Sequence, residues 1–230
     1  AQNYELPTTI KNDTCSILPL NISNLPNAKI SFANHTKVYD GTTNVLPKAV
    51  PDITITGLIP NFDNVQGAGK SASYDNKNVG TNKVVTIKDI IYSGNDALNY
   101  ILPNSVQNRS CSITPRSITE DPNLIVTFGN QKKFYDATTN VIDSIEGTIY
   151  VPQLQISGII SGDDVKALAV TAQYDTKNVG KNKIVTAFGV HLLGKDANNY
   201  LVPTTARNYN SSILPKELGK QAWFEVPNQT

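Results

Sequence analysis

Short runs of alternating apolar and polar residues, separated by turn-forming residues, occupy most of this 230-residue chain. Alternation with a period of two is typical of strands with one buried face, and no long stretch has helical periodicity. A single helical turn is expected at 96–100 and at 196–200, and residues 57–66 and 158–167 are the other places for a short helix. The pattern therefore predicts a mainly β fold, with strands at 29–33, 36–39, 52–56, 71–74, 83–92, 99–102 and 109–113, and at 124–128, 132–135, 153–156, 168–174, 183–193, 200–202 and 208–213.

The strand pattern repeats along the chain, together with the turns between the strands. The stretch 37–45 (KVYDGTTNV) returns at 133–141 as KFYDATTNV, and 74–83 returns at 174–183. Asn-Tyr followed by Pro three residues after the tyrosine marks the end of each copy. The recurring motif residues are Tyr39, Asp40, Gly41, Tyr74, Asp75, Gly80, Asn99 and Tyr100, with the partners Tyr135, Asp136, Ala137, Tyr174, Asp175, Gly180, Asn199 and Tyr200.

The repeats divide the chain into tandem modules of about 100 residues, a common domain size. Residues 1–19 correspond to the end of a preceding repeat, residues 20–115 to module 1 and residues 116–215 to module 2. Residues 216–230 match no module start, so they are a tail, a divergent next repeat or a cap. Each join contains Ser-Ile-x-Pro, and proline restricts its neighbourhood to extended geometry. We expect an end-to-end rod of β modules.

The Tyr-Asp corner at residues 39–41 and 135–137 is expected to be structural. An Asp followed by small and hydroxyl residues accepts hydrogen bonds from backbone N–H groups ahead of it. Because Ala137 replaces Gly41, we expect no positive φ there and a type I turn in both copies. Gly80 and Gly180, before the longest strands, are expected to supply the flexible hairpin position.

Each module is expected to close its own hydrophobic core. The core positions are the recurring apolar residues of the predicted strands and turns. They are Val38, Val45, Ile53, Ile55, Ile59, Val65, Tyr74, Val79, Val85, Ile87, Ile90, Leu98 and Tyr100 in module 1, and Phe134, Val141, Leu154, Ile156, Ile160, Val165, Tyr174, Val179, Val185 and Tyr200 in module 2.

Composition points away from nucleic acid and membrane partners. The formal net charge is +1, so no basic surface for nucleic acid is indicated. No apolar run approaches the roughly 18 residues that span a bilayer. Only 17% of residues are charged and Met is absent. This balance favours an extracellular β protein over a cytosolic helical enzyme.

The reactive side chains do not form a recognisable catalytic pattern. Cys15 and Cys111 occupy equivalent places in successive repeats, too far apart for a disulfide, and Ser211 takes the third place. We expect this position to hold a buried free thiol. His35 and His191 have no histidine counterpart in the other repeat, so no Cys-His pair or zinc site is indicated. The sequence predicts no enzyme, no catalytic residue and no cofactor.

Calcium is the one metal with candidate ligands in this sequence. Carboxylates are grouped near the predicted turns, and calcium takes six to eight oxygen ligands. Turn formation and capping explain the same residues without an ion, so this assignment stays an alternative. The candidates are Asp63, Asp96, Asp163, Asp164 and Asp196.

The opening Lys37–Thr43, the Gly162–Val165 segment, the Asn-Val-Gly at 178–180 and the segment Gly194–Tyr200 together resemble the YDG repeat module, which is related to MBG modules. The departures are 61–64 (NFDN), where the family has Gly-Asp-Asp, and Ala137. The resemblance implies a β-rich fold, sandwich-like or grasp-like, with no catalytic residues. Such modules occur in tandem in long bacterial surface and secreted proteins, including filamentous-haemagglutinin-like adhesins.

Two functions follow from the repeats and the resemblance. The first is a stalk or spacer at the bacterial cell surface or in a secreted protein, whose partners are neighbouring repeats of the same chain. The second is an adhesive module that binds a host protein or glycan. Binding hot spots favour Trp and Tyr. The non-repeating aromatic residues Trp223, Phe224, Tyr150 and Tyr209 are therefore the candidate ligand contacts.

Overall fold

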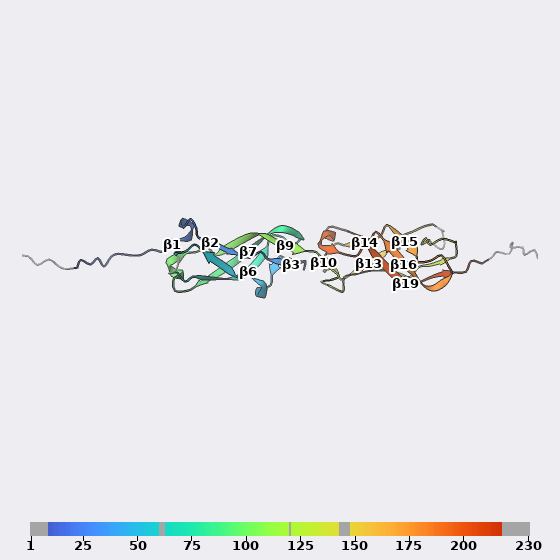
Figure 1. The fold of residues 1–230 in the computed structure, drawn as a ribbon, viewed down its shortest axis with the longest axis horizontal. Coiled ribbons are helices and arrows are strands. Elements are labelled where there is room, and N and C mark those ends of the chain that lie inside the picture. The colour runs from blue at the N-terminus through green and yellow to red at the C-terminus, as the bar shows by residue number, and fades with distance from the viewer. Residues whose placement is uncertain (1–8, 60–62, 120, 143–147, 218–230) are drawn as a thin grey trace, which may run out of the picture. The chain divides into compact units, whose positions relative to one another are not determined.

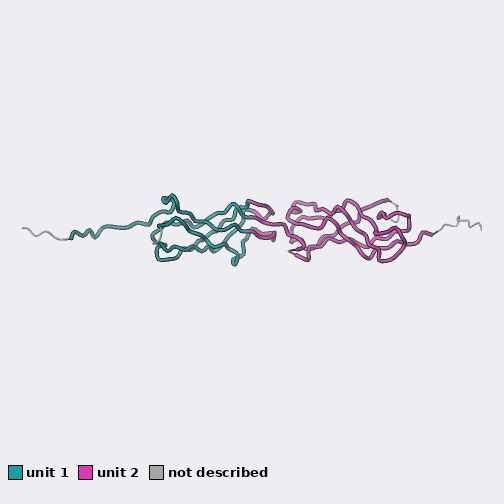
Figure 2. Tube along the Cα trace, in the orientation of Figure 1, with its two compact units in different colours: residues 1–35, 43–75, 82–111 teal, residues 36–42, 76–81, 112–230 magenta. Residues whose placement is uncertain are grey.

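The computed structural model describes residues 9–59, 63–119, 121–142 and 148–217. The chain divides into two compact units (Figure 2). Unit 1 comprises residues 1–35, 43–75 and 82–111, and unit 2 comprises residues 36–42, 76–81 and 112–230. Two segments of the first repeat, 36–42 and 76–81, therefore belong to unit 2. Each unit is described by itself below.

Strands form most of the first repeat (Figure 1), and their bounds follow the alternating pattern closely. The longest predicted strand is longer still in the structure, and the others shift by a few residues at their ends. The strands are β1 (Leu20–Asn21), β2 (Lys29–Phe32), β3 (Thr36–Val38), β4 (Asn44–Val45), β5 (Ile53–Thr56), β6 (Gln66–Tyr74), β7 (Gly80–Ser93), β8 (Tyr100–Ile101) and β9 (Ser105–Thr114).

Five of these strands form one mixed sheet in the order β3-β9-β7-β6-β4. Strand β3 lies parallel to the last residues of β9, with Thr36 opposite Ser112. Strand β6 is antiparallel to β7, with Tyr74 opposite Val85. The remaining strands form two small sheets, β1-β8 and β2-β5.

The second repeat follows the same order of strands with three differences: β14 and β15 replace β6, β16 and β17 replace β7, and the bridge Asn140–Gln173 stands where β4 pairs with β6. The single strands predicted at 168–174 and 183–193 are therefore each divided in two. Its main sheet has the order β12-β19-β16-β15, and three two-stranded sheets are β10-β18, β11-β13 and β14-β17. The strands are β10 (Arg116–Ser117), β11 (Ile125–Phe128), β12 (Lys132–Phe134), β13 (Leu154–Ser157), β14 (Lys166–Leu168), β15 (Thr171–Tyr174), β16 (Gly180–Phe188), β17 (His191–Leu193), β18 (Tyr200–Leu201) and β19 (Thr205–Leu214).

The structure is mainly β with two repeated β domains, as the sequence predicts. Helical elements among the described residues are 3₁₀ turns: η1 (Ile22–Asn24), η2 (Pro47–Ala49), η3 (Ala97–Asn99) and η4 (Ala197–Asn199). Turns η3 and η4 confirm the helical turns expected at 96–100 and 196–200. The described residues of 57–66 and 158–167 form turns and strand ends, so the short helices considered there are not found.

Inward-facing residues of these strands form the core. In unit 2 the buried cluster is Phe128, Val141, Leu154, Ala167, Ala172, Tyr174, Val185, Ala187, Val190, Ala206 and Ile213. In the first repeat, Val85 and Ile87 on β7 are fully buried. A buried aliphatic side chain contributes about 1.5–3 kcal/mol, so these rows dominate the stability of each sheet.

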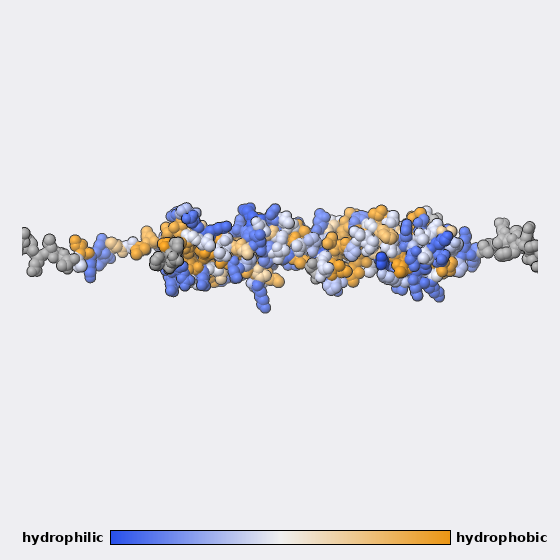
Figure 3. Space-filling view, in the orientation of Figure 1, coloured by the Kyte–Doolittle hydropathy of each residue, from blue (hydrophilic) through white to orange (hydrophobic). Residues whose placement is uncertain are grey.

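Four predicted core positions are wrong: Ile59, Leu98, Phe134 and Val179 are 52%, 89%, 52% and 48% exposed. Leu98 lies in the one-turn helix η3, which presents it to solvent. Strand β12 turns Lys133 inward, so the alternation places the neighbouring Phe134 outside. Apolar side chains on the surface are interspersed with hydrophilic ones (Figure 3).

The predicted turn geometries need two corrections. Gly41 and Ala137 have φ values of 76° and 64°, so the corner requires the left-handed conformation that we did not expect. Asp40 Oδ1 accepts a 2.9 Å bond from Thr42 N, which fixes the intervening residue in that conformation. At the start of β7 and β16, the positive φ belongs to Asn82 and Asn182, at 55° and 54°, and not to Gly80 and Gly180.

Candidate functional site

Each Tyr-Asp corner is held by the lysine that precedes it. Lys133 Nζ donates to Asp136 Oδ1 at 2.8 Å and to the carbonyl oxygens of Thr138 and Asn140 at 2.8 and 2.9 Å. In the first copy, Lys37 Nζ donates to Asp40 Oδ1 at 2.7 Å and to Thr42 O at 2.8 Å. The corner is a compact ring of charge-assisted hydrogen bonds, and such bonds are stronger than neutral ones.

The tyrosine of the first corner belongs to a second group of polar residues, which we call the Asp163 cluster. It comprises Tyr39, Lys77, Asp163, Asp196 and Tyr200, all of which lie in unit 2. Asp163 Oδ2 accepts hydrogen bonds from Tyr39 OH at 2.8 Å and from Tyr200 OH at 2.7 Å. Asp163 Oδ1 accepts a 2.8 Å bond from Lys77 Nζ, which also lies 3.5 Å from Asp196 Oδ1.

Packing around the Asp163 cluster is tight. Tyr39 is 0% exposed, and the Asp163 side chain is 2% exposed. The rings of Tyr39 and Tyr200 meet edge to face, with centroids 5.6 Å apart and planes at 75°. Such aromatic pairs add about 0.5–1.5 kcal/mol to their burial.

Two close approaches of the backbone accompany the Asp163 cluster. Val79 N donates a 2.9 Å hydrogen bond to Asn199 Oδ1. A Cβ on Gly41 would lie 2.9 Å from Ile160 Cγ2, so the corner touches Ile160 where only a glycine fits without movement. The Tyr-Asp corner is therefore fitted to the surface formed by Ile160, Asp163 and Asn199.

Electrostatics fix the charge states in the Asp163 cluster. Burial disfavours the Asp163 carboxylate, but hydrogen bonds from Lys77, Tyr200 and Tyr39 outweigh it and lower the pKa below 3.8. The hydrogen bond to Asp163 raises the pKa of Lys77 above 10.5. Burial and the contact with Asp163 raise the pKa values of Tyr39 and Tyr200 above 10.0. At neutral pH Lys77 and Asp163 form an ion pair, and the phenols of Tyr39 and Tyr200 are neutral.

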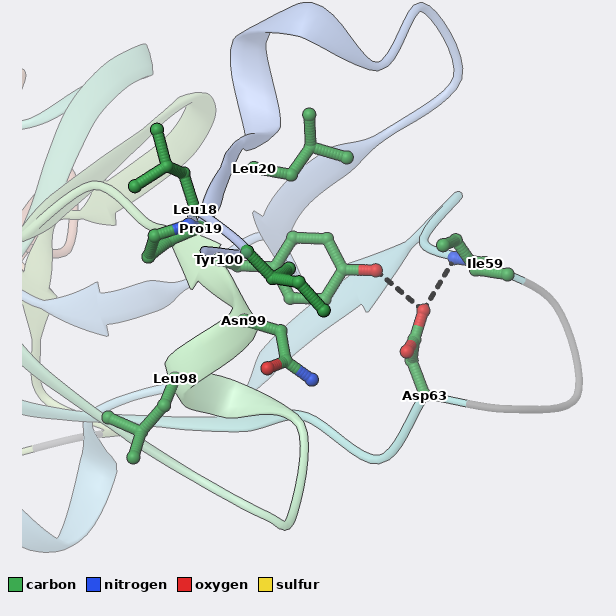
Figure 4. A pocket seen from close by; sticks show the side chains of 9 residues that line it. Leu18, Pro19, Leu20, Ile59, Asp63, Leu98, Asn99 and Tyr100 are labelled. Carbon is green, nitrogen blue, oxygen red and sulfur yellow. Dashed lines mark hydrogen bonds between the residues drawn. The ribbon is translucent and has the colours of Figure 1, made fainter. Parts of the chain in front are cut away.

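Unit 1 has the counterpart of the receiving half of this cluster (Figure 4). Asp63 Oδ2 accepts bonds from Tyr100 OH at 2.6 Å and from Ile59 N at 2.8 Å. Asp96 Oδ2 accepts a 2.7 Å bond from Asn64 N, as Asp196 Oδ2 does from Asp164 N at 3.0 Å. Asp63, Asp96, Asn99 and Tyr100 correspond by sequence to Asp163, Asp196, Asn199 and Tyr200.

Comparison with known proteins identifies the family to which the sequence belongs. The family model of the YDG domain matches residues 26–108 and 119–207. The chain belongs to the YDG domain family. No curated protein and no solved structure matches the chain. Among the described residues, no helix is long and apolar enough to cross a membrane.

The other recurring YDG positions stabilise individual strands and turns. Tyr74 OH contacts His35 Nδ1 at 2.7 Å, and Tyr174 OH donates to Ser212 O at 3.3 Å. Burial raises the pKa of Tyr174 to about 12. Asp75 and Asp175 pair with Lys83 and Lys183 at 3.2 and 2.9 Å. Gly80 and Gly180 begin β7 and β16.

The candidate calcium ligands of the YDG modules accept hydrogen bonds from the protein. The hydrogen bonds given above engage the carboxylates of four of them: Asp63, Asp96, Asp163 and Asp196. For the fifth, Asp164, the backbone carbonyl oxygen accepts a 3.3 Å bond from Asp196 N. The described part of the chain has no group of three or more His, Cys, Asp and Glu residues that could hold a metal ion. The carboxylates are turn and cluster residues.

The two cysteines are free and differ in environment. Cys111 is 1% exposed, and its Sγ accepts a bond from His35 N at 3.3 Å. Ser211 in the next repeat accepts from Gln131 N in the same way at 3.0 Å. Cys15 is exposed, so its predicted burial is wrong, because residues 9–19 form no strand and have no sheet to pack on.

Non-repeating aromatic residues are the candidate ligand contacts. Tyr209 is 56% exposed and Tyr150 is 39% exposed. The Tyr150 hydroxyl donates to Gln131 Oε1, so that group is engaged within the module. Trp223 and Phe224 lie outside the described residues.

Sequence reasoning missed the contact between the YDG corner and Asp163. The motif tyrosine and the motif aspartate were both recognised, but each was assigned to its own module. One signal was available: every repeat carries a Tyr-Asp corner, a Lys-Asn-Val-Gly turn, an Asp near residue 63 or 163 and an Asn-Tyr pair. More polar residues recur at the same positions of both repeats than the formation of single turns requires. This excess indicates a contact between residues of different repeats.

Proposed function

We propose that this chain is a non-enzymatic, extracellular stalk or spacer segment of a large bacterial surface or secreted adhesin, related to those that contain MBG modules. Its modules extend a distant binding region away from the cell. The mechanical requirement is that successive modules resist separation and bending. The chemistry of the chain is then structural, and the motif residues serve folding and module joining.

The hydrogen bond from Tyr39 to Asp163 is the observation that supports this proposal most directly. Both residues are family motif positions, and both are used for cohesion within unit 2. The prolines of the Ser-Ile-x-Pro joins restrict the chain at the same place. Motif residues engaged with one another suit a load-bearing element better than a reaction centre.

Small-angle X-ray scattering tests the extension role. The natural chain is compared with a chain in which residues 20–115 are duplicated, so that residues 1–115 are followed by residues 20–230. A stalk predicts that the maximum dimension rises by the length of one module, while the cross-section stays constant. A duplicated chain that becomes thicker instead of longer would contradict the proposal.

Adhesion by the modules themselves is the second candidate, and Tyr209 is the residue that favours it. This side chain is 56% exposed and replaces Arg109 of the first module. Exposed, repeat-specific aromatics are typical anchors of binding surfaces. An array of glycans and host matrix proteins tests the idea. Binding by the natural chain that is lost in Tyr209→Ala and kept in Arg109→Ala supports adhesion, and no binding to the array removes it.

A further inference from the structure

The residues that receive Tyr39 in unit 2 recur in unit 1 and form a hollow there. This hollow has a volume of 240 Å³ and is lined by Leu18, Pro19, Ile59, Asp63, Asn99 and Tyr100 (Figure 4). Its floor is the Asp63–Tyr100 hydrogen bond, which corresponds to the Asp163–Tyr200 bond. The hollow is therefore the counterpart of the surface that holds the Tyr-Asp corner in unit 2.

Exposure distinguishes the occupied surface from the open one. Asn199 is 3% exposed and Asp196 is 5% exposed, whereas Asn99 is exposed and Asp96 is half-buried. Ile160 is half-buried beside Gly41, whereas Ile59 is 52% exposed. The asparagine, aspartate and isoleucine at these positions are thus more exposed in unit 1 than in unit 2, while Tyr100 and Tyr200 are both buried.

The approaching chain segment shows the same contrast. Ile17 and Leu18 precede Pro19 as Ile113 and Thr114 precede Pro115. Ile113 is 2% exposed, because it lies in β9 and pairs with Lys37 of β3. Ile17 and Leu18 are 100% and 80% exposed. Residues 15–19 therefore have the sequence of a terminal strand but no β3 beside them in the described structure.

The second repeat presents the complementary end. Tyr135, Lys177 and Val179 correspond to Tyr39, Lys77 and Val79. Tyr135 is half-buried where Tyr39 is fully buried, Lys177 is exposed, and Val179 is 48% exposed where Val79 is half-buried. This end carries a lysine, whereas the other end carries the carboxylates of Asp63 and Asp96. The opposite charges favour one orientation when two modules pair.

We propose that the face formed by Ile59, Asp63, Asp96, Asn99 and Tyr100 binds the Tyr-Lys end of another copy of the YDG module, placed before it in the chain. The occupant offers a corner tyrosine and a lysine to Asp63, and a backbone N–H to Asn99. Because the two faces differ, the contact is head to tail and does not close on itself, so modules can be added without limit. This inference rests on the tandem function proposed above and gives it a mechanism.

The chain with residues 20–115 duplicated tests the proposal by hydrogen exchange. The readout is the Val79 amide, which in the natural chain donates to Asn199. In the duplicated chain, Val79 of the first copy would donate to Asn99 of the second copy, and Val79 of the second copy would donate to Asn199. The proposal predicts one slow mass envelope for the peptide that contains Val79. Two envelopes whose rates differ by roughly tenfold, the effect of one hydrogen bond, would overturn it.

Matched variants place the contact on one face. Asp63→Asn in the second copy removes the charge that faces the first copy, so the fast envelope should appear. Asp63→Asn in the first copy is the control, because this copy's Asp63 does not take part in the new contact. One envelope should remain. Duplication of residues 116–215, read at Val179, is a second chain that tests the presenting end. Val179 of the first copy would donate to Asn199 of the second copy, while Val179 of the second copy stays exposed, as in the natural chain. The proposal therefore predicts one slow and one fast envelope there, and a single fast envelope would contradict it.

The outcome is separable from that of the scattering experiment. If the chain lengthens by one module but shows two Val79 envelopes, the modules are joined only by their linkers. This result contradicts the docking face and supports the stalk function. If the chain shows one Val79 envelope but does not lengthen, the result supports the docking face and contradicts the stalk function.

Discussion

The hydroxyl of Tyr39 donates a 2.8 Å hydrogen bond to Asp163, 124 residues later in the chain. Tyr39 comes from the corner that recurs in both repeats, and Asp163 comes from the Gly-Asp-Asp segment of the second repeat. The bond is buried, and Lys77 and Tyr200 share the same carboxylate. Motif residues of the two repeats thus act together within unit 2.

Asp163→Ala should lower the free energy of unfolding of unit 2 by about 2–4 kcal/mol. The substitution leaves two tyrosine hydroxyls without their acceptor, and each unsatisfied buried group costs about 1–3 kcal/mol. The lost ion pair adds little, because the Lys77 side chain is 38% exposed. The measurement is a urea series followed by NMR at Val85 in unit 1 and Val185 in unit 2.

Asp63→Ala is the matched control in unit 1. It removes the acceptor of Tyr100 OH and Ile59 N, but no second tyrosine and no lysine. Its effect should be about 1–2 kcal/mol, seen at Val85. Equal losses from the two substitutions would mean that Tyr39 and Lys77 contribute nothing through Asp163.

Stability of the Asp163 cluster should be lost at both ends of the pH range. The depressed pKa of Asp163 gives a contribution that is full above its unfolded value of 3.8 and is lost as pH falls through the lower folded value. The raised pKa values of Tyr39 and Tyr200 give contributions that are full below 10.0 and are lost as pH rises through the higher folded values. Lys77 acts in the same sense above 10.5.

The test of this pH dependence is a comparison of urea midpoints at Val185 for the natural chain and for Asp163→Asn. Other carboxylates of unit 2, such as Asp136 and Asp175, also have lowered pKa values, so the acid loss of the natural chain has several sources. The difference between the two proteins isolates Asp163. That difference should shrink as pH falls below 3.8, and a constant difference would rule out the assigned charge state.

Lys133→Met should destabilise unit 2 more than Lys37→Met destabilises the first corner. The Lys133 side chain is 1% exposed and the Lys37 side chain is 12% exposed. Methionine keeps the apolar stem but removes the lysine donor from two carbonyl oxygens and from Asp136, which keeps its bond from Thr138 N. We expect a loss of about 2–4 kcal/mol for Lys133→Met and about half of that for Lys37→Met. Lys37 and Lys133 both belong to unit 2, so urea unfolding followed at Val185 measures both variants, and the reverse ranking would contradict the burial argument.

Ala137→Gly should stabilise unit 2 by up to about 1 kcal/mol. Ala137 has φ 64°, where an L-residue with a Cβ is strained and glycine is not. The reciprocal change, Gly41→Ala, should destabilise, because it adds the same strain and places a Cβ 2.9 Å from Ile160 Cγ2. Thermal unfolding of the two variants checks both signs, and a loss of stability in Ala137→Gly would contradict the strain.

Much of the fold was readable from the sequence because β alternation and repetition are local signals. Val85 and Ile87 alternate with polar residues and are fully buried in β7. The errors arise where a polar contact overrides the pattern. Lys133 is buried by its ring of oxygen acceptors, which turns Phe134 outward, and the Asp136 side chain holds Ala137 at a positive φ.

The candidate site was only half readable. Repetition indicates Tyr39 and Tyr200 as motif residues, and Asp163 is a calcium candidate in the sequence, but an alignment of repeats pairs Tyr39 with Tyr135 and Asp163 with Asp63. It does not indicate that Tyr39 meets Asp163, because that contact joins different parts of successive repeats. Only the packing of segments 36–42 and 76–81 into unit 2 brings these residues together.

A double-mutant cycle on Tyr39→Phe and Asp163→Ala tests the central claim, that motif residues of successive repeats stabilise one another. The free energy of unfolding of unit 2 is measured for the natural chain, both single variants and the double variant. We predict a coupling energy of about 1–2 kcal/mol, because the Tyr39→Phe variant has no hydroxyl that could lose its acceptor when Asp163 is removed. Additivity within about 0.5 kcal/mol would show that the two residues are energetically independent and would contradict the account.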